Sequence, residues 1–147
     1  MKKFILILAV IPLIAACSAI ILKPVNFGWP IEDVLTPDDK GMVEEKRHSI
    51  SFDVTPLYQA EFGDSAKADS KEMRIIRNNE GYYFITAQGF KYVYVFNSGE
   101  GTFELENKFL ASLEGLQNPV LNQRNTYIEL IDGNNIYELT AKGITKR

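Results

Sequence analysis

The chain has 147 residues, of which 46% are hydrophobic, 12% aromatic and 24% charged, and its formal net charge is −3. These values are typical of a folded globular protein and exclude collagen-like, disordered and multi-span membrane chains. The single cysteine, Cys17, excludes an intramolecular disulfide framework and a multi-cysteine zinc site, and the single histidine, His48, leaves little scope for histidine-based catalysis.

The N-terminus has the pattern of a secretory signal peptide. Two lysines are followed by an apolar run over residues 4–16, which is too short to cross about 30 Å of hydrocarbon as a helix. The run ends in Ile14-Ala15-Ala16-Cys17, which resembles the lipobox of bacterial lipoproteins. The resemblance implies cleavage after Ala16, a diacylglycerol on the Cys17 thiol and an acyl chain on the new amino group.

Acylation of this kind predicts a permanent membrane tether, since each buried methylene contributes about 0.8 kcal/mol. Ser18 resembles the residue found after the cysteine in lipoproteins sorted to the outer membrane, facing the periplasm, if the host is Gram-negative. Two alternatives remain open: an ordinary signal peptide with an incidental thiol at Cys17, and an uncleaved signal anchor over residues 4–22. The lipoprotein and signal-anchor interpretations both place the rest of the chain outside the cytoplasm, at a membrane.

The sequence predicts three segments: a lipoprotein signal peptide over residues 1–16, a lipidated N-terminus and tether over 17–42, and a single β-rich domain over 43–147. Three of the six prolines fall between residues 23 and 42, where no hydrophobic period is sustained, and we expect at most one helical turn over 30–35. Basic residues are scattered and form no stripe with aromatic residues, which disfavours a nucleic-acid partner.

The first predicted elements of the domain are a strand and a short helix. Alternate residues from His48 to Val54 are expected on one face of the strand. The helix is expected over residues 55–63, with Thr55 as its N-cap and Gly63 as its stop. The small polar residues 64–71 predict a loop.

Further strand candidates follow, separated by turn signals. They are residues 73–77, 82–87, 91–96, 102–106, 108–113, 126–131 and 136–140. The stretch that contains Gly115 and Asn118-Pro119 is expected to be irregular. Residues 83–90 are similar in sequence to residues 137–144, which predicts two equivalent hairpins. The fold class is therefore mostly β, an antiparallel meander folded into a small sandwich or barrel, with one or two short helices.

Aromatic residues are concentrated between residues 82 and 96. The strands over 82–87 and 91–96 are apolar on both faces, as expected for strands in the centre of a sandwich. The alternative is that Tyr82, Tyr92 and Tyr94 face a protein partner, because tyrosine is enriched where interfaces are strongest.

No catalytic residue, metal ligand or cofactor site is predicted. His48 is interpreted as a residue at the end of a strand rather than a general base. Glu104 and Glu106 are expected on a solvated strand face, opposite Leu105. Residues 132–135 predict a tight turn rather than a calcium loop, because the acidic residue that closes such a loop is missing.

The sequence leaves three hypotheses for function. The preferred one is a membrane-anchored lipoprotein of the cell envelope that acts as a non-catalytic protein-binding module, of the assembly accessory, inhibitor or immunity type. The first alternative is a carrier of a small, lipid-like ligand in an aromatic-lined β interior. The second is an envelope hydrolase that uses two carboxylates from distant strands.

Overall fold

The computed structural model describes residues 31–68 and 71–147. The strands in this part of the chain are β1 (Asp33–Leu35), β2 (Met42–Glu45), β3 (Ile50–Asp53), β4 (Met73–Arg77), β5 (Tyr83–Ala87), β6 (Tyr92–Ser98), β7 (Phe103–Leu110), β8 (Pro119–Gln123), β9 (Ile128–Asp132), β10 (Asn135–Thr140) and β11 (Gly143–Lys146). Its helix is α1 (Thr55–Phe62). The predicted signal peptide and Cys17 lie outside the described residues.

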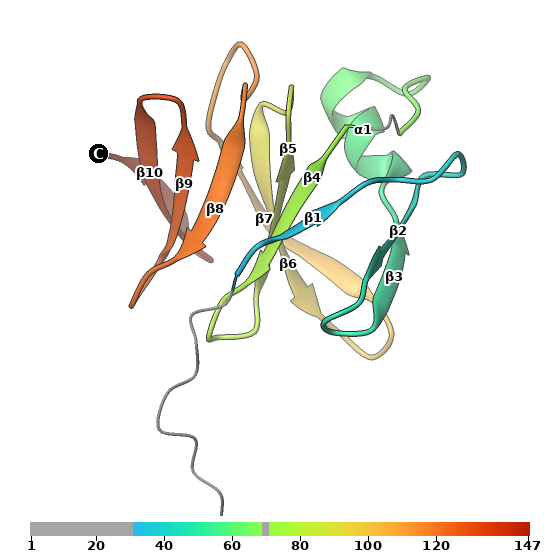
Figure 1. Ribbon diagram of the computed structural model, residues 1–147, viewed down its shortest axis with the longest axis horizontal. Coiled ribbons are helices and arrows are strands. Elements are labelled where there is room, and N and C mark those ends of the chain that lie inside the picture. Colours follow the sequence, from blue (N-terminus) through green and yellow to red (C-terminus); the bar gives the residue numbers. More distant parts are fainter. Residues whose placement is uncertain (1–30, 69–70) are drawn as a thin grey trace, which may run out of the picture.

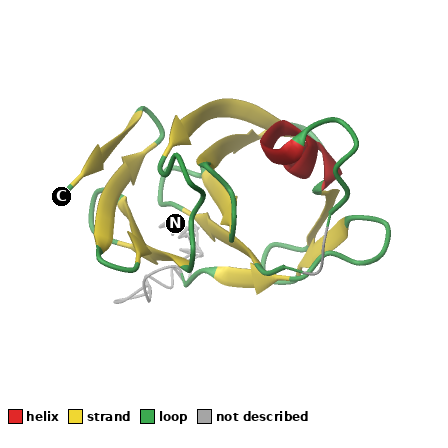
Figure 2. Cartoon of the chain, turned by 90° about the horizontal axis from the view of Figure 1, so that it is seen from above, coloured by secondary structure: helices red, strands yellow, loops and turns green. Residues whose placement is uncertain are grey.

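Three layers build the structure (Figure 1). A five-stranded antiparallel sheet in the order β1-β4-β5-β6-β7 is the central layer, and a four-stranded antiparallel sheet in the order β11-β10-β9-β8 packs on one of its faces. The β2–β3 hairpin and α1 cover the other face, so that the helix and the C-terminus lie on opposite sides of the molecule (Figure 2). The predicted mostly β, antiparallel fold is confirmed; the sheets form a sandwich and do not close into a barrel.

β5 is the strand that both hydrophobic cores share. Tyr83, Ile85 and Ala87 pack into the core beneath the hairpin and α1, whereas Phe84 packs into the core between the two sheets. All five residues of the strand are buried, which confirms that its apolar character on both faces marks a central strand. Burial of a side chain the size of Phe84 contributes about 1.5–3 kcal/mol, so each face of β5 contributes to stability.

Side-chain hydrogen bonds join the two sheets along both of their sides. On one side Glu32, just before β1, accepts the backbone N–H of Leu121 in β8 at 2.7 Å and pairs with Arg74 of β4 at 2.9 Å. On the other side the amide of Asn107 in β7 donates to the carbonyl of Ala141, after β10, at 2.8 Å. The sandwich is thus held by polar contacts as well as by its core.

Helix α1 confirms the predicted helix but not its cap. Val54 occupies the N-cap position, and the Asp53 carboxylate accepts the Thr55 N–H at 2.8 Å. Thr55 is therefore the first helical residue rather than the cap. The helix ends at Gly63 as expected, where φ is +100° and the N–H donates to the carbonyl of Gln59 at 2.9 Å.

Two segments that were expected to lack strands contain them. The predicted helical turn over residues 30–35 is wrong, because Asp33–Leu35 pair with β4 as the edge of the central sheet. The folded part of the chain therefore includes residues from the segment assigned to the tether. The predicted irregular stretch contains β8, in which Pro119 is the first residue, a position where a missing N–H is tolerated.

Two predicted strands are one. Residues 103–110 form the single strand β7, whose register against β6 shifts between Val95 and Phe96. Such a β-bulge places one extra residue in a strand and interrupts the alternation from which strands are predicted. His48 lies in the turn before β3 rather than within a strand, next to Ser49, whose φ is +55°. The short strands β2 and β11 were not predicted.

Candidate functional site

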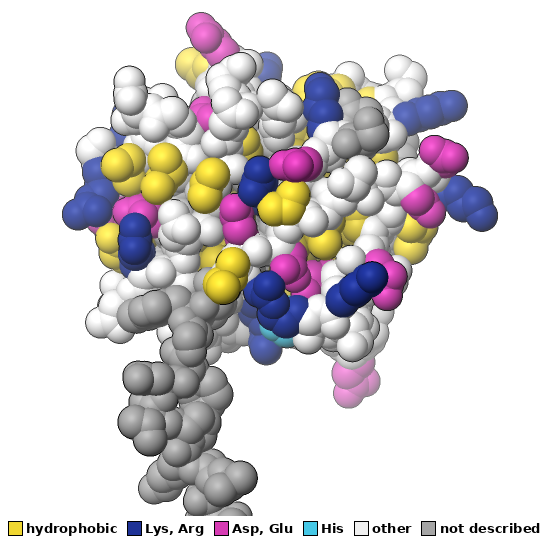
Figure 3. Space-filling model, in the orientation of Figure 1, with side chains coloured by type: hydrophobic (Ala, Val, Ile, Leu, Met, Phe, Trp, Pro, Cys, Tyr) yellow, Lys and Arg dark blue, Asp and Glu magenta, His cyan; other side chains and the backbone are white. Residues whose placement is uncertain are grey.

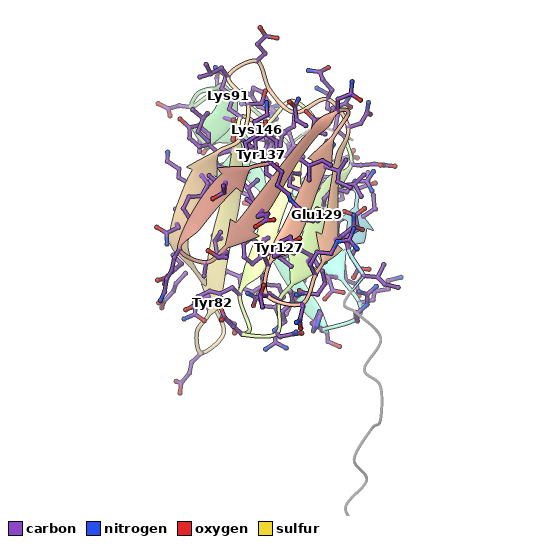
Figure 4. The ribbon with its side chains drawn as sticks, turned by 90° about the vertical axis from the view of Figure 1, so that its left-hand side faces the viewer. Tyr82, Lys91, Tyr127, Glu129, Tyr137 and Lys146 are labelled. Atoms are coloured by element: carbon purple, nitrogen blue, oxygen red, sulfur yellow. The ribbon has the colours of Figure 1, made fainter. Side chains whose placement is uncertain are left out.

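The three tyrosines predicted to face a partner have different surroundings. Tyr94 is only 2% exposed and belongs to the core beneath the hairpin, so its ring is not accessible to a partner, whereas Tyr82 and Tyr92 are half-buried. Tyr82 immediately precedes β5, at the end of the strand where Tyr83 pairs with Phe96. Tyr92 is the first residue of β6, at the opposite end of the β5–β6 pair. Figure 4 shows the same separation between Tyr82 and Lys91. These tyrosines do not form one surface.

The buried Tyr94 is fixed in its neutral form. Burial raises its pKa, and the nearby carboxylate of Glu61 raises it further by repelling a phenolate. Glu61 itself is held in place from α1, since it accepts the backbone N–H groups of Lys91 at 2.8 Å and Tyr92 at 3.1 Å. The contact locks α1 onto the start of β6, which is a structural role for these residues.

Two exposed leucines of β7 lie opposite aromatic residues of β6. Tyr92 and Phe96 lie four residues apart on β6 and point to the same face, and their partners across the sheet are Leu110 and Leu105. Leu105 is 54% exposed and Leu110 is 44% exposed. We call the surface formed by Tyr92, Leu105 and Leu110 the leucine face. It lies on the hairpin side of the central sheet, beyond the part that the hairpin and α1 cover.

The leucine face is presented by an edge strand. β7 is the last strand of its sheet, and edge strands are open to pairing with other chains. Its exposed charged residues Glu104, Glu106 and Lys108, together with the bulge, disfavour such pairing. Glu104 and Glu106 are exposed as predicted, and Leu105, which was expected on the opposite face, is exposed as well.

Acidic and basic residues lie side by side on the surface. Figure 3 shows Lys and Arg side chains interspersed with Asp and Glu on the face that contains β1 and β4. Two pairs of oppositely charged residues form ion pairs: Arg47 with Asp33 at 2.7 Å, and Arg74 with Glu72 at 2.8 Å. This face therefore carries no single-sign patch.

A buried carboxylate organises the tip of the β2–β3 hairpin. Glu45 is 1% exposed; its Oε1 accepts the Arg47 N–H at 2.8 Å, and its Oε2 accepts the His48 N–H at 2.8 Å and lies 2.7 Å from His48 Nδ1. The His48 ring stands edge-on to Tyr83, with centroids 5.7 Å apart. Glu45 also shares a hydrogen bond with the carboxyl group of Asp33 in β1. The cluster ties the hairpin to the edge of the central sheet.

The shared hydrogen bond moves the two carboxyl pKa values apart. It raises the pKa of Asp33, and burial adds to this effect. Burial also acts to raise the pKa of Glu45, but hydrogen bonds from Asp33, His48 and Arg47 outweigh it, so that this pKa is lowered. Glycosidase carboxyl groups stand at least about 5 Å apart to admit the sugar or a water. A directly hydrogen-bonded pair leaves no such space.

A cavity of about 690 Å³ opens between the hairpin and the central sheet. We call it the hairpin cavity. It is bounded by β3, the first turn of α1, β5, the end of β6 and the loop before β7. The aromatic residues that line it are Phe52, Tyr83, Phe96 and Phe103. No local sequence pattern indicates this cavity, because its walls come from segments about 50 residues apart.

The described residues contain no group of three or more His, Cys, Asp or Glu side chains that could hold a metal ion. The predicted turn at residues 132–135 is confirmed, with strands β9 and β10 on either side. The Asp132 carboxylate accepts the N–H groups of Gln117 at 2.9 Å and Asn118 at 2.7 Å. It therefore holds the loop that precedes β8.

No protein-family model, curated protein or solved structure matches this chain. Among the residues with described structure, α1 is the only helix, and it is too short and too polar to cross a membrane. Of the predicted site residues, Cys17 lies outside the described part of the chain. Three features can therefore indicate a function: the leucine face, the cluster around Glu45, and the hairpin cavity.

Proposed function

We propose that the protein is a membrane-anchored lipoprotein of the cell envelope that acts as a non-catalytic protein-binding module. In a Gram-negative host its place would be the outer membrane, facing the periplasm. The lipobox-like ending at Cys17 supports the anchor. The observation that carries the binding role is the leucine face, the exposed edge of the central sheet on which Leu110 lies opposite Tyr92 and Leu105 lies opposite Phe96. Roles as an assembly accessory, an inhibitor or an immunity protein all fit this surface.

The composition of the leucine face favours a protein partner. Burial of a leucine side chain contributes about 1.5–3 kcal/mol, and a tyrosine beside it is typical of the residues that dominate interface energies. The Lys108 ammonium lies 4.9 Å from the centroid of the Tyr92 ring, which places a charged group between the two leucines. Because β7 is protected against strand pairing, the partner is expected to pack against the side chains and not to extend the sheet.

The Glu45 cluster supports the non-catalytic part of the proposal. His48 is oriented by Glu45, but both belong to the turn that fixes the hairpin. The acceptor atoms of Glu45 are occupied by neighbouring N–H groups and by the Asp33 carboxyl group. An acid–base role would require these bonds to break, which would release the hairpin from β1.

Site-specific photocrosslinking in intact cells tests the binding role. A photoreactive amino acid at position 110 should give one adduct of defined mass, which is lost when Leu105→Asp is added to the same chain. The matched controls are the photoreactive residue at position 145, exposed on β11, and the substitution Thr145→Asp. Equal adducts from positions 110 and 145, or an adduct that persists with Leu105→Asp, would contradict the proposal.

The anchor is tested separately. Cells that express the wild type or Cys17→Ala are labelled with a fatty-acid probe, and the protein is followed in membrane and soluble fractions. The wild type should carry the label and sediment with membranes, whereas Cys17→Ala should carry no label. Undiminished labelling of Cys17→Ala would overturn the lipoprotein assignment.

A further inference from the structure

The hairpin cavity lies between the β2–β3 hairpin and the central sheet, which are held apart by the side chains between them. β2 and β3 pair as strands only with each other and not with a strand of the central sheet. At one end the Glu45 cluster ties the hairpin to β1. At the other end β3 continues into α1, which Glu61 attaches to the start of β6. Between these two attachments Phe52 meets Phe103 edge-on, with centroids 5.2 Å apart. The span between the attachments is left unfilled.

The walls of the cavity are apolar and rigid. Phe103 is the central ring, since its centroid lies 4.8 Å from that of Tyr83 and 6.1 Å from that of Phe96. Ile85 and Leu57, both buried, complete the inner wall. Volumes of about 300–1,000 Å³ lined mainly by aromatic and aliphatic side chains are typical of sites for small organic ligands.

The mouth of the cavity is polar but carries no positive charge. The residues there are Ser49, Ser51, Ser98, Thr102 and two glycines, Gly99 and Gly101. The lining contains no Lys, Arg or His, and its one charged residue is the carboxylate of Asp53. Arg77 contacts the Tyr83 ring at 5.5 Å from the centroid, but it does not line the cavity.

This lining selects the charge of a ligand. A carboxylate or phosphate head would find no cation in the lining to pair with, and an unpaired charge in such a place is costly. The Asp53 carboxylate, which accepts the Thr55 N–H, adds a negative charge at the α1 end of the cavity. Hydroxyl groups at the mouth can both donate to and accept from an uncharged hydroxyl or ester. An apolar cavity gains contacts from an apolar occupant that water does not supply.

From these observations we infer that the hairpin cavity binds a neutral amphiphile of the monoacylglycerol kind, with its apolar body against the aromatic wall and its uncharged, hydroxyl-bearing head at the serine- and threonine-lined mouth. The inference goes beyond the proposed protein-binding role and does not depend on it, because Leu105 and Leu110 do not line the cavity. It gives the carrier alternative a definite site, which lies outside the sandwich core rather than within a barrel.

The test uses the full-length chain purified from membranes and returned to phosphatidylcholine vesicles without detergent, since detergents are themselves amphiphiles. A monoacylglycerol with a photoreactive diazirine in its acyl chain is added, and crosslinked residues are mapped by mass spectrometry. The label should fall on the cavity residues Phe52, Phe96 and Phe103. Unlabelled monooleoylglycerol should compete at a concentration about tenfold lower than oleate does.

A designed cation at the mouth provides a second readout. Thr102→Lys places an ammonium group beside the head of the ligand, and one charge-assisted hydrogen bond should strengthen competition by oleate about tenfold. Thr145→Lys, the same exchange at an exposed site on β11, should change neither competitor. The two wild-type competition curves stand on their own if Thr102→Lys folds poorly by far-UV circular dichroism.

Three results would overturn the inference. One is a label spread over exposed residues such as Leu105 and Leu113, as contact with the bilayer alone would give. The second is a label that excess monooleoylglycerol does not displace. The third is competition by oleate that equals competition by monooleoylglycerol in the wild type. None of these results bears on the crosslinks from position 110, so the two proposals fail independently.

Discussion

Substitution of Glu45 should show how much the hairpin depends on one buried carboxylate. In Glu45→Gln one carboxylate oxygen is replaced by an NH₂ group. This group would face the donors that now bond to the carboxylate, which are the backbone N–H groups of Arg47 and His48 and the His48 ring. One hydrogen bond to a charged acceptor is lost if the NH₂ group takes the place of Oε1, and two are lost if it takes the place of Oε2, at about 1.5–3 kcal/mol each. We expect the free energy of unfolding to fall by about 2–5 kcal/mol at pH 7.

The pH dependence of stability carries a second signature of Glu45. Its lowered pKa contributes stability above its ordinary value of 4.5, and this contribution is lost as the pH falls through the folded-state value. The raised pKa of Asp33 acts in the opposite sense, since its contribution is complete below the ordinary value of 3.8 and is lost as the pH rises through the folded-state value. Glu45→Gln should remove the loss of stability that the wild type shows below about pH 4.5.

Urea unfolding followed by far-UV circular dichroism between pH 3.5 and 7 measures both effects. Glu44→Gln is the matched control, because Glu44 is the neighbouring residue of β2 and is exposed. It should unfold within about 0.5 kcal/mol of the wild type. A Glu45→Gln protein as stable as the Glu44→Gln control at pH 7 would refute the view that this carboxylate holds the hairpin.

Two further substitutions test the close contacts of the sandwich. Gly115→Ala places a methyl group 2.6 Å from the backbone oxygen of Gly89 in the β5–β6 turn, so it should lower the free energy of unfolding by about 3 kcal/mol or more. Gly133→Ala is the control, because Gly133 also has a positive φ but its methyl group would lie in open space; it should cost about 1 kcal/mol in the same urea assay. Glu32→Ala removes a half-buried partner of Arg74 and should lower the free energy of unfolding by about 2–3 kcal/mol. Glu72→Ala removes an exposed partner of the same arginine and should cost less than about 1 kcal/mol. Equal losses would contradict the view that Glu32 joins the two sheets.

The parts of the fold that could be predicted are those in which local pattern and tertiary burial agree. β4 has the predicted bounds 73–77, and β5 could be recognised as central because its residues are apolar on both faces. β8 was missed because Asn122 and Gln123 interrupt its apolar pattern. β2 was missed because it contains Glu45, whose burial depends on donors from the turn that follows.

The two segments with similar sequences, residues 83–90 and 137–144, each begin in an inner strand of a sheet. β5 and β10, which begin the two copies, each pair with the strands before and after them in antiparallel order. Their equivalent residues are used differently, since Tyr83 packs beneath the hairpin and Tyr137 packs between the sheets. β6 and β9 also pair with both of their neighbours, so the predicted pair of similar hairpins stays a prediction.

The candidate sites were only partly accessible to prediction. Tyr92 was named from its sequence and does lie at the surface, but the exposure of Leu105 depends on where the cover of the sheet ends, which no local pattern records. The hairpin cavity depends on the distance between two layers and on rings from distant segments, such as Phe52 and Phe103. Periodicity shows which way a side chain points within its strand, but not what lies opposite it.

The two hydrophobic cores lie on opposite faces of the same central sheet, so neither core can be removed without exposing the other side of that sheet. Removing the hairpin and α1, or cutting the chain before β8, would bare one whole side of β5, with Tyr83 on one side and Phe84 on the other. Such a fragment would present aromatic surface together with unprotected strands, the combination that promotes aggregation. Neither half of this chain is therefore a module that could be transplanted, and any duplication or truncation of the gene would have to preserve all three layers at once.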